Sequence, residues 1–93
     1  FPGAGQPLSH YKDAASYEWR VNIVDHQDEL LAAMQEVSPD LEAKDFADVL
    51  DTCDAIDRGI EGGELTQQTA TRFDVDFGQA GELVLVSQEY ACP

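Results

Sequence analysis

The chain of 93 residues carries 19 acidic and five basic side chains, which give a formal net charge of −14 at pH 7. That charge excludes binding to nucleic acid or to an anionic membrane surface, because both need lysines and arginines to neutralise phosphates or lipid headgroups. The length predicts one domain, and the longest uncharged apolar run, residues 83–86, is far too short to span a bilayer.

Residues 1–10 are rich in glycine and proline and almost free of charge, which predicts a flexible leader or tether. The sequence contains no signal peptide and begins with Phe1 rather than methionine, so we interpret it as a processed or trimmed fragment. Residues 11–93 are expected to form a single helical domain.

The segment 11–24 fits two kinds of secondary structure. Four apolar residues alternate with polar ones, as in a β-strand: Tyr17, Trp19, Val21 and Ile23. In a helix, Trp19 and Ile23 share one face, which continues into the next segment with an interruption at Gln27. We favour the helix because no convincing partner strand lies nearby.

From Asp25 onward the helical pattern is clearer. Apolar residues recur at positions i, i+1, i+4 and i+7 of one face: Leu30, Leu31, Met34 and Val37. Pro39 is expected to end this helix before Ser38 starts the next one.

The segment Ser38–Gly59 carries helix signals at both ends. Ser38 is a favourable N-cap, and Pro39 suits the first helical position, where its missing N–H costs nothing. Arg58 lies in the last turn, and Gly59 stands where helices usually stop. Apolar residues at steps of three and four predict one buried stripe: Phe46, Val49, Cys53, Ile56 and Ile60.

Residues 59–76 are expected to be a connection with a short helix over 66–73. Asp76 and Gln79 then match a capping box, and the apolar spacing that follows predicts a helix up to Cys92. The alternative is a hairpin that pairs residues 73–77 with 82–86, and we favour the helix.

The chain has two cysteines, Cys53 in the predicted apolar stripe and Cys92 near the C-terminus. Two cysteines in a small, lysine-poor, acidic domain fit an oxidising compartment and predict a disulfide, with free thiols as the alternative. We therefore expect an all-α fold: a small bundle of three to four helices braced by one disulfide, Cys53–Cys92.

Several short motifs resemble a family of small actinobacterial domains: Met34–Leu41, the Cys53 helix that ends at Asp57-Arg58-Gly59, Gln79-Ala80 followed by Leu83-Val84, and the terminal Tyr90-Ala91-Cys92-Pro93. From Asp25 to Pro93 the chain is similar to the secreted or lipid-anchored family catalogued as domain of unknown function 732. Members commonly end in Cys-Pro. The resemblance implies a helical fold with one disulfide, exported to the cell envelope, and implies no activity. In a lipid-anchored member, the lipid-bearing cysteine would lie upstream of Phe1.

Two groups of residues are candidates for binding a partner. Asp45, Asp48 and Asp51 step by three along the predicted central helix, so they lie on one outer face. This face is either a docking surface for a cation or basic partner, or a solvated surface that keeps an exported protein soluble. The aromatic residues Tyr11, Tyr17 and Trp19 are either anchors of a binding surface or side chains that close the core from the N-terminal side.

The metal-binding motifs are incomplete. Asp54–Ile60 and Asp74–Gly78 resemble the start of EF-hand loops, but Leu65 and Leu85 occupy the positions of the closing glutamate. His26 and Glu29 would supply two ligands, whereas zinc normally needs three or four. We therefore predict no metal site and no cofactor, and leave open a weak calcium site outside these motifs.

No catalytic residues are predicted. The serines lack a nucleophile-elbow context, and Cys53 lies on a buried face, where a thiol is inert. The favoured function is an exported, non-enzymatic interaction module that presents an acidic helix face to an unknown protein or cell-wall partner. The alternative is a small carboxylate-based or metal-dependent enzyme, which would need a concave pocket that gathers carboxylates from at least two segments.

Overall fold

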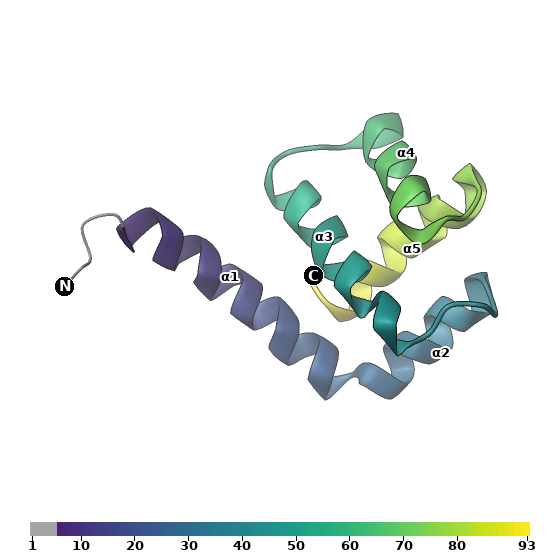
Figure 1. Ribbon diagram of the computed structural model, residues 1–93, viewed down its shortest axis with the longest axis horizontal. Helices are drawn as coiled ribbons and strands as arrows, with labels where there is room; N and C mark the ends of the chain where they lie inside the picture. The colour runs from purple at the N-terminus through teal and green to yellow at the C-terminus, as the bar shows by residue number, and fades with distance from the viewer. Residues whose placement is uncertain (1–5) are drawn as a thin grey trace.

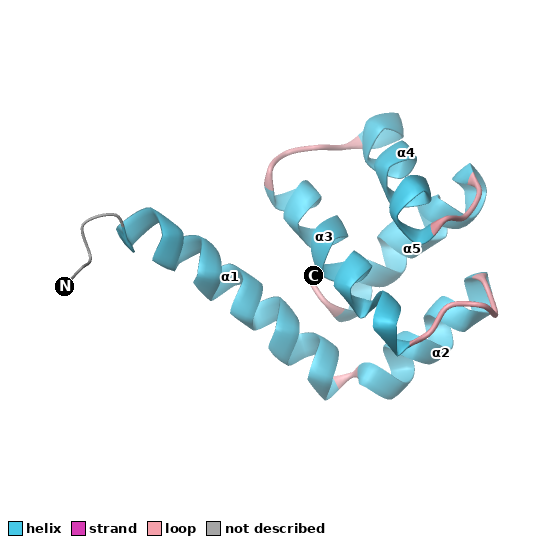
Figure 2. Cartoon of the chain, in the orientation of Figure 1, coloured by secondary structure: helices cyan, strands magenta, loops and turns pink. Residues whose placement is uncertain are grey.

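The computed structural model describes the backbone of residues 6–93 and the side chains of residues 16–93. Within this range the chain forms five α-helices, one short 3₁₀ turn and no strand: α1 (Gln6–Asp25), α2 (Gln27–Val37), η2 (Ala43–Asp45), α3 (Phe46–Asp57), α4 (Gly62–Phe73) and α5 (Phe77–Tyr90) (Figures 1 and 2). The predicted all-α class is confirmed, whereas the predicted number of three to four helices is wrong.

The favoured helical structure of both ambiguous segments is confirmed, and the strand alternatives are wrong. The ambiguous segment 11–24 belongs to α1, and the rival hairpin over residues 73–86 is replaced by the end of α4 and most of α5. Helix α1 begins at Gln6, so it includes the second half of the leader expected over residues 1–10. The first half, residues 1–5, lies outside the described residues.

A single residue, His26, separates α1 from α2. Its backbone conformation, with φ of −121° and ψ of 24°, departs from the α-helix, yet its N–H still bonds the carbonyl of Asn22. Ile23 before this bend and Leu30 and Met34 after it are all buried in the same core cluster.

The start predicted for the central helix is wrong. Ser38 is extended, as the residue before a proline prefers, and the chain then turns so that Leu41 is buried. The turn is held by the Gln35 side chain, whose Nε2 donates to the Leu41 carbonyl at 3.0 Å. Helical structure begins instead at a capping box, in which the backbone N–H of Glu42 bonds Oδ2 of Asp45 at 2.8 Å.

The predicted end of the central helix is confirmed. Gly59 has a φ of +90°, which a residue with a side chain rarely adopts. Its N–H bonds the carbonyl of Ile56, and the N–H of Ile60 bonds that of Ala55, a Schellman motif. Helix α4 follows almost at once, because it begins at Gly62 rather than at Thr66 as expected.

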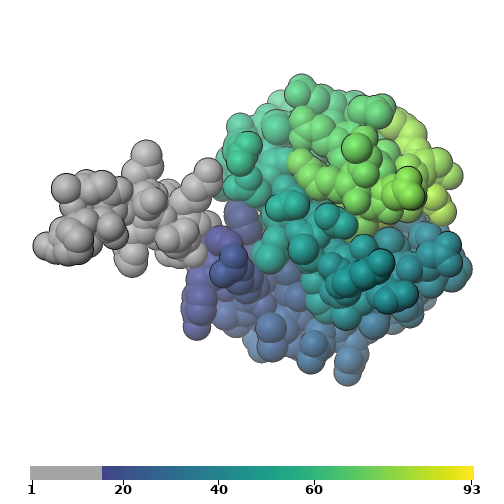
Figure 3. Space-filling view, viewed as in Figure 1, coloured from purple at the N-terminus to yellow at the C-terminus, as the bar shows by residue number. Residues whose placement is uncertain are grey.

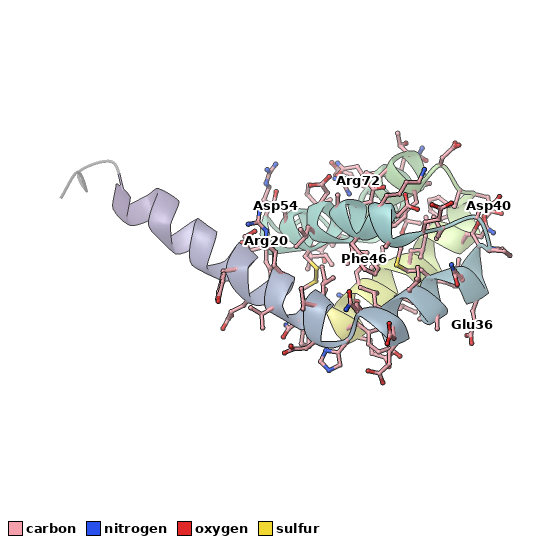
Figure 4. All side chains as sticks on the ribbon, turned by 60° about the horizontal axis from the view of Figure 1, so that its bottom comes forward. Arg20, Glu36, Asp40, Phe46, Asp54 and Arg72 are labelled. Carbon is pink, nitrogen blue, oxygen red and sulfur yellow. A yellow bond between two sulfur atoms is a disulfide. The ribbon has the colours of Figure 1, made fainter. Side chains whose placement is uncertain are left out.

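Helix α5 lies at the centre of the bundle and contacts α2, α3 and α4. The main core cluster takes buried residues from all five helices and the segments between and after them: Ile23, Leu30, Met34, Leu41, Val49, Cys53, Phe73, Leu83 and Ala91. Phe46, at the start of α3, is half-buried against this cluster and points towards the interior (Figure 4).

A smaller cluster joins α3, α4 and α5 through Ala55, Leu65 and Val84, with Ile56 and Ile60 packed against it. The predicted stripe on α3 is therefore the packing face of that helix.

The predicted capping box at the start of α5 is confirmed. Asp76 Oδ1 accepts from the Gln79 N–H at 2.7 Å, and Gln79 Oε1 accepts from the Asp76 N–H at 3.2 Å.

We expect Asp76→Ala to lower the free energy of unfolding by about 1 kcal/mol, the typical contribution of such a cap. Asp76→Asn is the matched control, since it removes the same charge but keeps an acceptor. Urea unfolding of both variants checks this, and equal losses would contradict the capping role.

Candidate functional site

The two cysteines form the predicted disulfide. Cys53 and Cys92 are bonded with their Cα atoms 5.9 Å apart, and the bond is seen in Figure 4. Cys53 is buried in α3 and Cys92 is half-buried just beyond α5. A second link holds the chain end, since Asn22 Nδ2 of α1 donates to the Ala91 carbonyl at 2.8 Å. The last residues therefore lie between α1 and α3 (Figure 1).

The aromatic candidates on α1 have different environments. Trp19 is half-buried and packs against the core cluster, as expected for a side chain that closes the core. Tyr17 is 67% exposed, and Val21 and Val24 on the same side of the helix are also exposed. The side chain of Tyr11 lies outside the described part of the chain.

A surface hollow of about 380 Å³ lies where α1 meets the chain end. It is lined by Tyr17, Glu18, Trp19, Val21, Asn22, Cys92 and Pro93. Two of the sequence candidates, Tyr17 and Trp19, therefore share this hollow, whereas Asp45, Asp48 and Asp51 do not line it. Among the described side chains that line it, Glu18 is the one acidic residue, so these side chains do not bring together acids from two segments.

The three aspartates of η2 and α3 have separate roles. Asp45 caps η2 through its bond to the Glu42 N–H, a structural role that the sequence analysis missed although the Glu42-x-x-Asp45 spacing signals it. Asp51 is exposed, and Asp48 is half-buried on the side facing α4. Helices α3 and α4 lie side by side on the face shown in Figure 3.

Burial raises the pKa of Asp48 above its usual value of 3.8, and the neighbouring charges of Asp45 and Asp51 raise it further. The cation of Arg72 opposes this shift from α4 (Figure 4). Arg72 donates through one terminal nitrogen to Gln68 Oε1 at 3.2 Å, while its other terminal nitrogen is buried without a hydrogen-bond partner. Asp48 is thus an acid whose ionised form the fold disfavours.

We expect Asp48→Asn to stabilise the protein at pH 7. The folded state binds this proton more tightly than the unfolded state, so the charge of Asp48 lowers stability as pH rises above 3.8 and through the higher folded value. Below pH 3.8 both states are protonated, and the advantage of the variant should disappear. Thermal melting across this range tests the prediction. The exposed Asp51→Asn is the control, and an equal gain from it would show that net charge alone is responsible.

No group of three or more potential metal ligands occurs among the described side chains. Both incomplete EF-hand stretches lie largely within or against helices: Asp54 is inside α3 and forms an ion pair with Arg58 at 2.7 Å, and Asp74 ends α4 in a left-handed conformation. His26 Nδ1 lies 3.0 Å from the carbonyl of Asn22. His10 lies outside the described side chains.

The described residues include no helix with the length and apolar character that crossing a membrane requires. Comparisons with protein-family models, with curated proteins and with solved structures found no match to this chain.

Sequence reasoning identified two residues of the hollow as site candidates but missed Glu18, Val21, Asn22 and Pro93. One signal was available: Tyr17, Val21 and Val24 follow a helical i, i+4, i+7 spacing on the side of α1 opposite Trp19 and Ile23. No sequence pattern near Cys92 and Pro93 indicates that they form a wall of the hollow, because that wall depends on a contact with α1, at the other end of the chain.

Proposed function

We propose that the protein is an exported, non-enzymatic interaction module that binds a cationic protein or cell-wall partner. The observation that carries this proposal is the state of its acidic side chains. Among the described residues there is one ion pair, Arg58–Asp54, although the chain has 19 acids and five bases. Most of the negative charge is therefore left for solvent or a partner to neutralise.

Two surfaces are proposed to take part. The first is the acidic surface of η2 and α3 with Asp45, Asp48 and Asp51, and the second is the N-terminal helix with Tyr11, Tyr17 and Trp19. Two further acids, Glu36 at the end of α2 and Asp40 in the turn that follows, are exposed (Figure 4). Positively charged partners are attracted to such a surface over distances near the Debye length, which speeds association.

Two features support export. The Cys53–Cys92 disulfide is of the kind that persists in oxidising compartments. The resemblance of residues 25–93 to the secreted or lipid-anchored actinobacterial domain points to the cell envelope, and we keep membership in that family as part of the proposal.

The proposed function is tested with a short synthetic peptide that alternates lysine with alanine. We expect binding by calorimetry at ~0.01 M salt and a marked loss at ~0.5 M, because screening shortens the Debye length around the acidic surface about sevenfold. The same peptide with acetylated lysines should not bind. A version of the protein with the same composition in scrambled order is the matched control for net charge. Absence of binding, or equal binding by the scrambled chain, would contradict the proposal.

A further inference from the structure

The exposed side of α1 carries an apolar stripe that no other described part of the chain covers. Tyr17 is 67% exposed, Val21 38% and Val24 64%, and their spacing places them on one side of the helix. Single exposed apolar side chains are ordinary on a protein surface. Here the stripe is continuous with a hollow, since Tyr17 and Val21 also line the space beside the chain end.

The position of the hollow is fixed by tertiary contacts. Asn22 on its α1 wall bonds the Ala91 carbonyl, and the disulfide places Cys92 and Pro93 on the opposite wall. Its volume of about 380 Å³ lies near the lower end of the range for small-ligand sites, roughly 300–1,000 Å³. There is room for one or two side chains of a partner, but not for a folded element.

The lining of the hollow favours a cation with an apolar stem. The rings of Tyr17 and Trp19 attract positive charge through their faces, and Glu18 adds a carboxylate. Among the residues whose side chains the structure describes, no lysine or arginine lines the hollow. Lysine and arginine side chains combine an aliphatic stem, suited to Val21 and Pro93, with a charged end group. A second copy of this chain is disfavoured, because each copy carries a net charge of −14.

We propose that this hollow is the anchor point for a basic peptide segment of the partner, and that it takes a lysine or arginine side chain between the α1 aromatics and Glu18. This inference rests on the proposed function, which requires a cationic partner but does not say where it is anchored. The acidic faces elsewhere would attract the partner, and the hollow would determine its position.

Trp19 is the only tryptophan in the chain, so its fluorescence reports directly on the hollow. The probe is the lysine-alanine peptide, titrated while tryptophan emission and affinity are both recorded. We expect a saturable change in emission that the acetylated peptide does not cause. Glu18→Gln and Tyr17→Ala should each weaken binding about two- to fivefold, the range for an exposed cation–aromatic contact or ion pair.

Two matched variants keep the test specific. Glu82→Gln removes the same charge from an exposed position on α5, and Phe77→Ala removes an exposed aromatic ring; neither residue lines the hollow. Losses confined to Glu18→Gln and Tyr17→Ala, with unchanged circular dichroism, support the anchor site. Equal losses in Glu18→Gln and Glu82→Gln, or binding without a change in Trp19 emission, overturn it while leaving the proposed function intact. Absence of any binding overturns both.

Discussion

Breaking the disulfide should lower the free energy of unfolding by about 4 kcal/mol. Cys53 and Cys92 are 39 positions apart, and the chain-entropy model gives this figure for a loop of that length. The loss is large compared with the roughly 5–10 kcal/mol that stabilises a small domain. It should be seen on reduction with dithiothreitol and in the variant Cys92→Ala, by urea unfolding.

The control for this prediction is the Cys92→Ala variant treated with reductant, which should show no further change because it has no disulfide to lose. Asn22 would then be the remaining polar link from α1 to the chain end that the structure describes. A melting temperature of the unaltered protein that does not respond to reductant would show that the disulfide does not stabilise the fold.

The second large effect is expected from Leu83→Ala. Leu83 lies in α5 and is 1% exposed within the main core cluster, where α5 contacts α2, α3 and α4. Removing its side chain should cost about 2–5 kcal/mol, because the lost burial is accompanied by a cavity in a closely packed interior. This loss is a large part of the roughly 5–10 kcal/mol that stabilises a small domain.

Leu85→Ala is a matched control for this substitution. Leu85 is two residues further along the same helix and is 65% exposed, so the same substitution there should change stability by no more than about 0.5 kcal/mol. Urea unfolding of both variants under identical conditions measures the difference. Similar losses at the two positions would mean that α5 does not present the face described here to the core.

Local patterns predicted those features that depend on neighbouring residues. The capping box of Asp76 and Gln79 and the stop at Gly59 were both predicted correctly, because each consists of hydrogen bonds within a few residues. The buried face of α3, with Val49 and Cys53, followed from helical spacing. The disulfide was predictable because the chain has two cysteines.

Features that depend on distant packing were missed. Ser38 and Pro39 form a sound helix start by local rules, yet the burial of Leu41 requires a turn there and moves the start to Glu42. The break at His26 was missed as well, because the spacing of Ile23, Leu30 and Met34 is equally compatible with one continuous helix. Asp45 was interpreted as part of an outer face, whereas it caps the turn that this rearrangement creates.

The sequence by itself determined the helical class, the disulfide partners and the strong negative charge, since these follow from local hydrogen bonding, apolar spacing and composition. The tertiary structure alone decided the number of helices, the bend at His26 and the hollow beside the chain end. Each of these features depends on how segments far apart in the chain pack into one small core. The hollow in particular joins α1 to Cys92 and Pro93, and no pattern confined to either segment contains that contact.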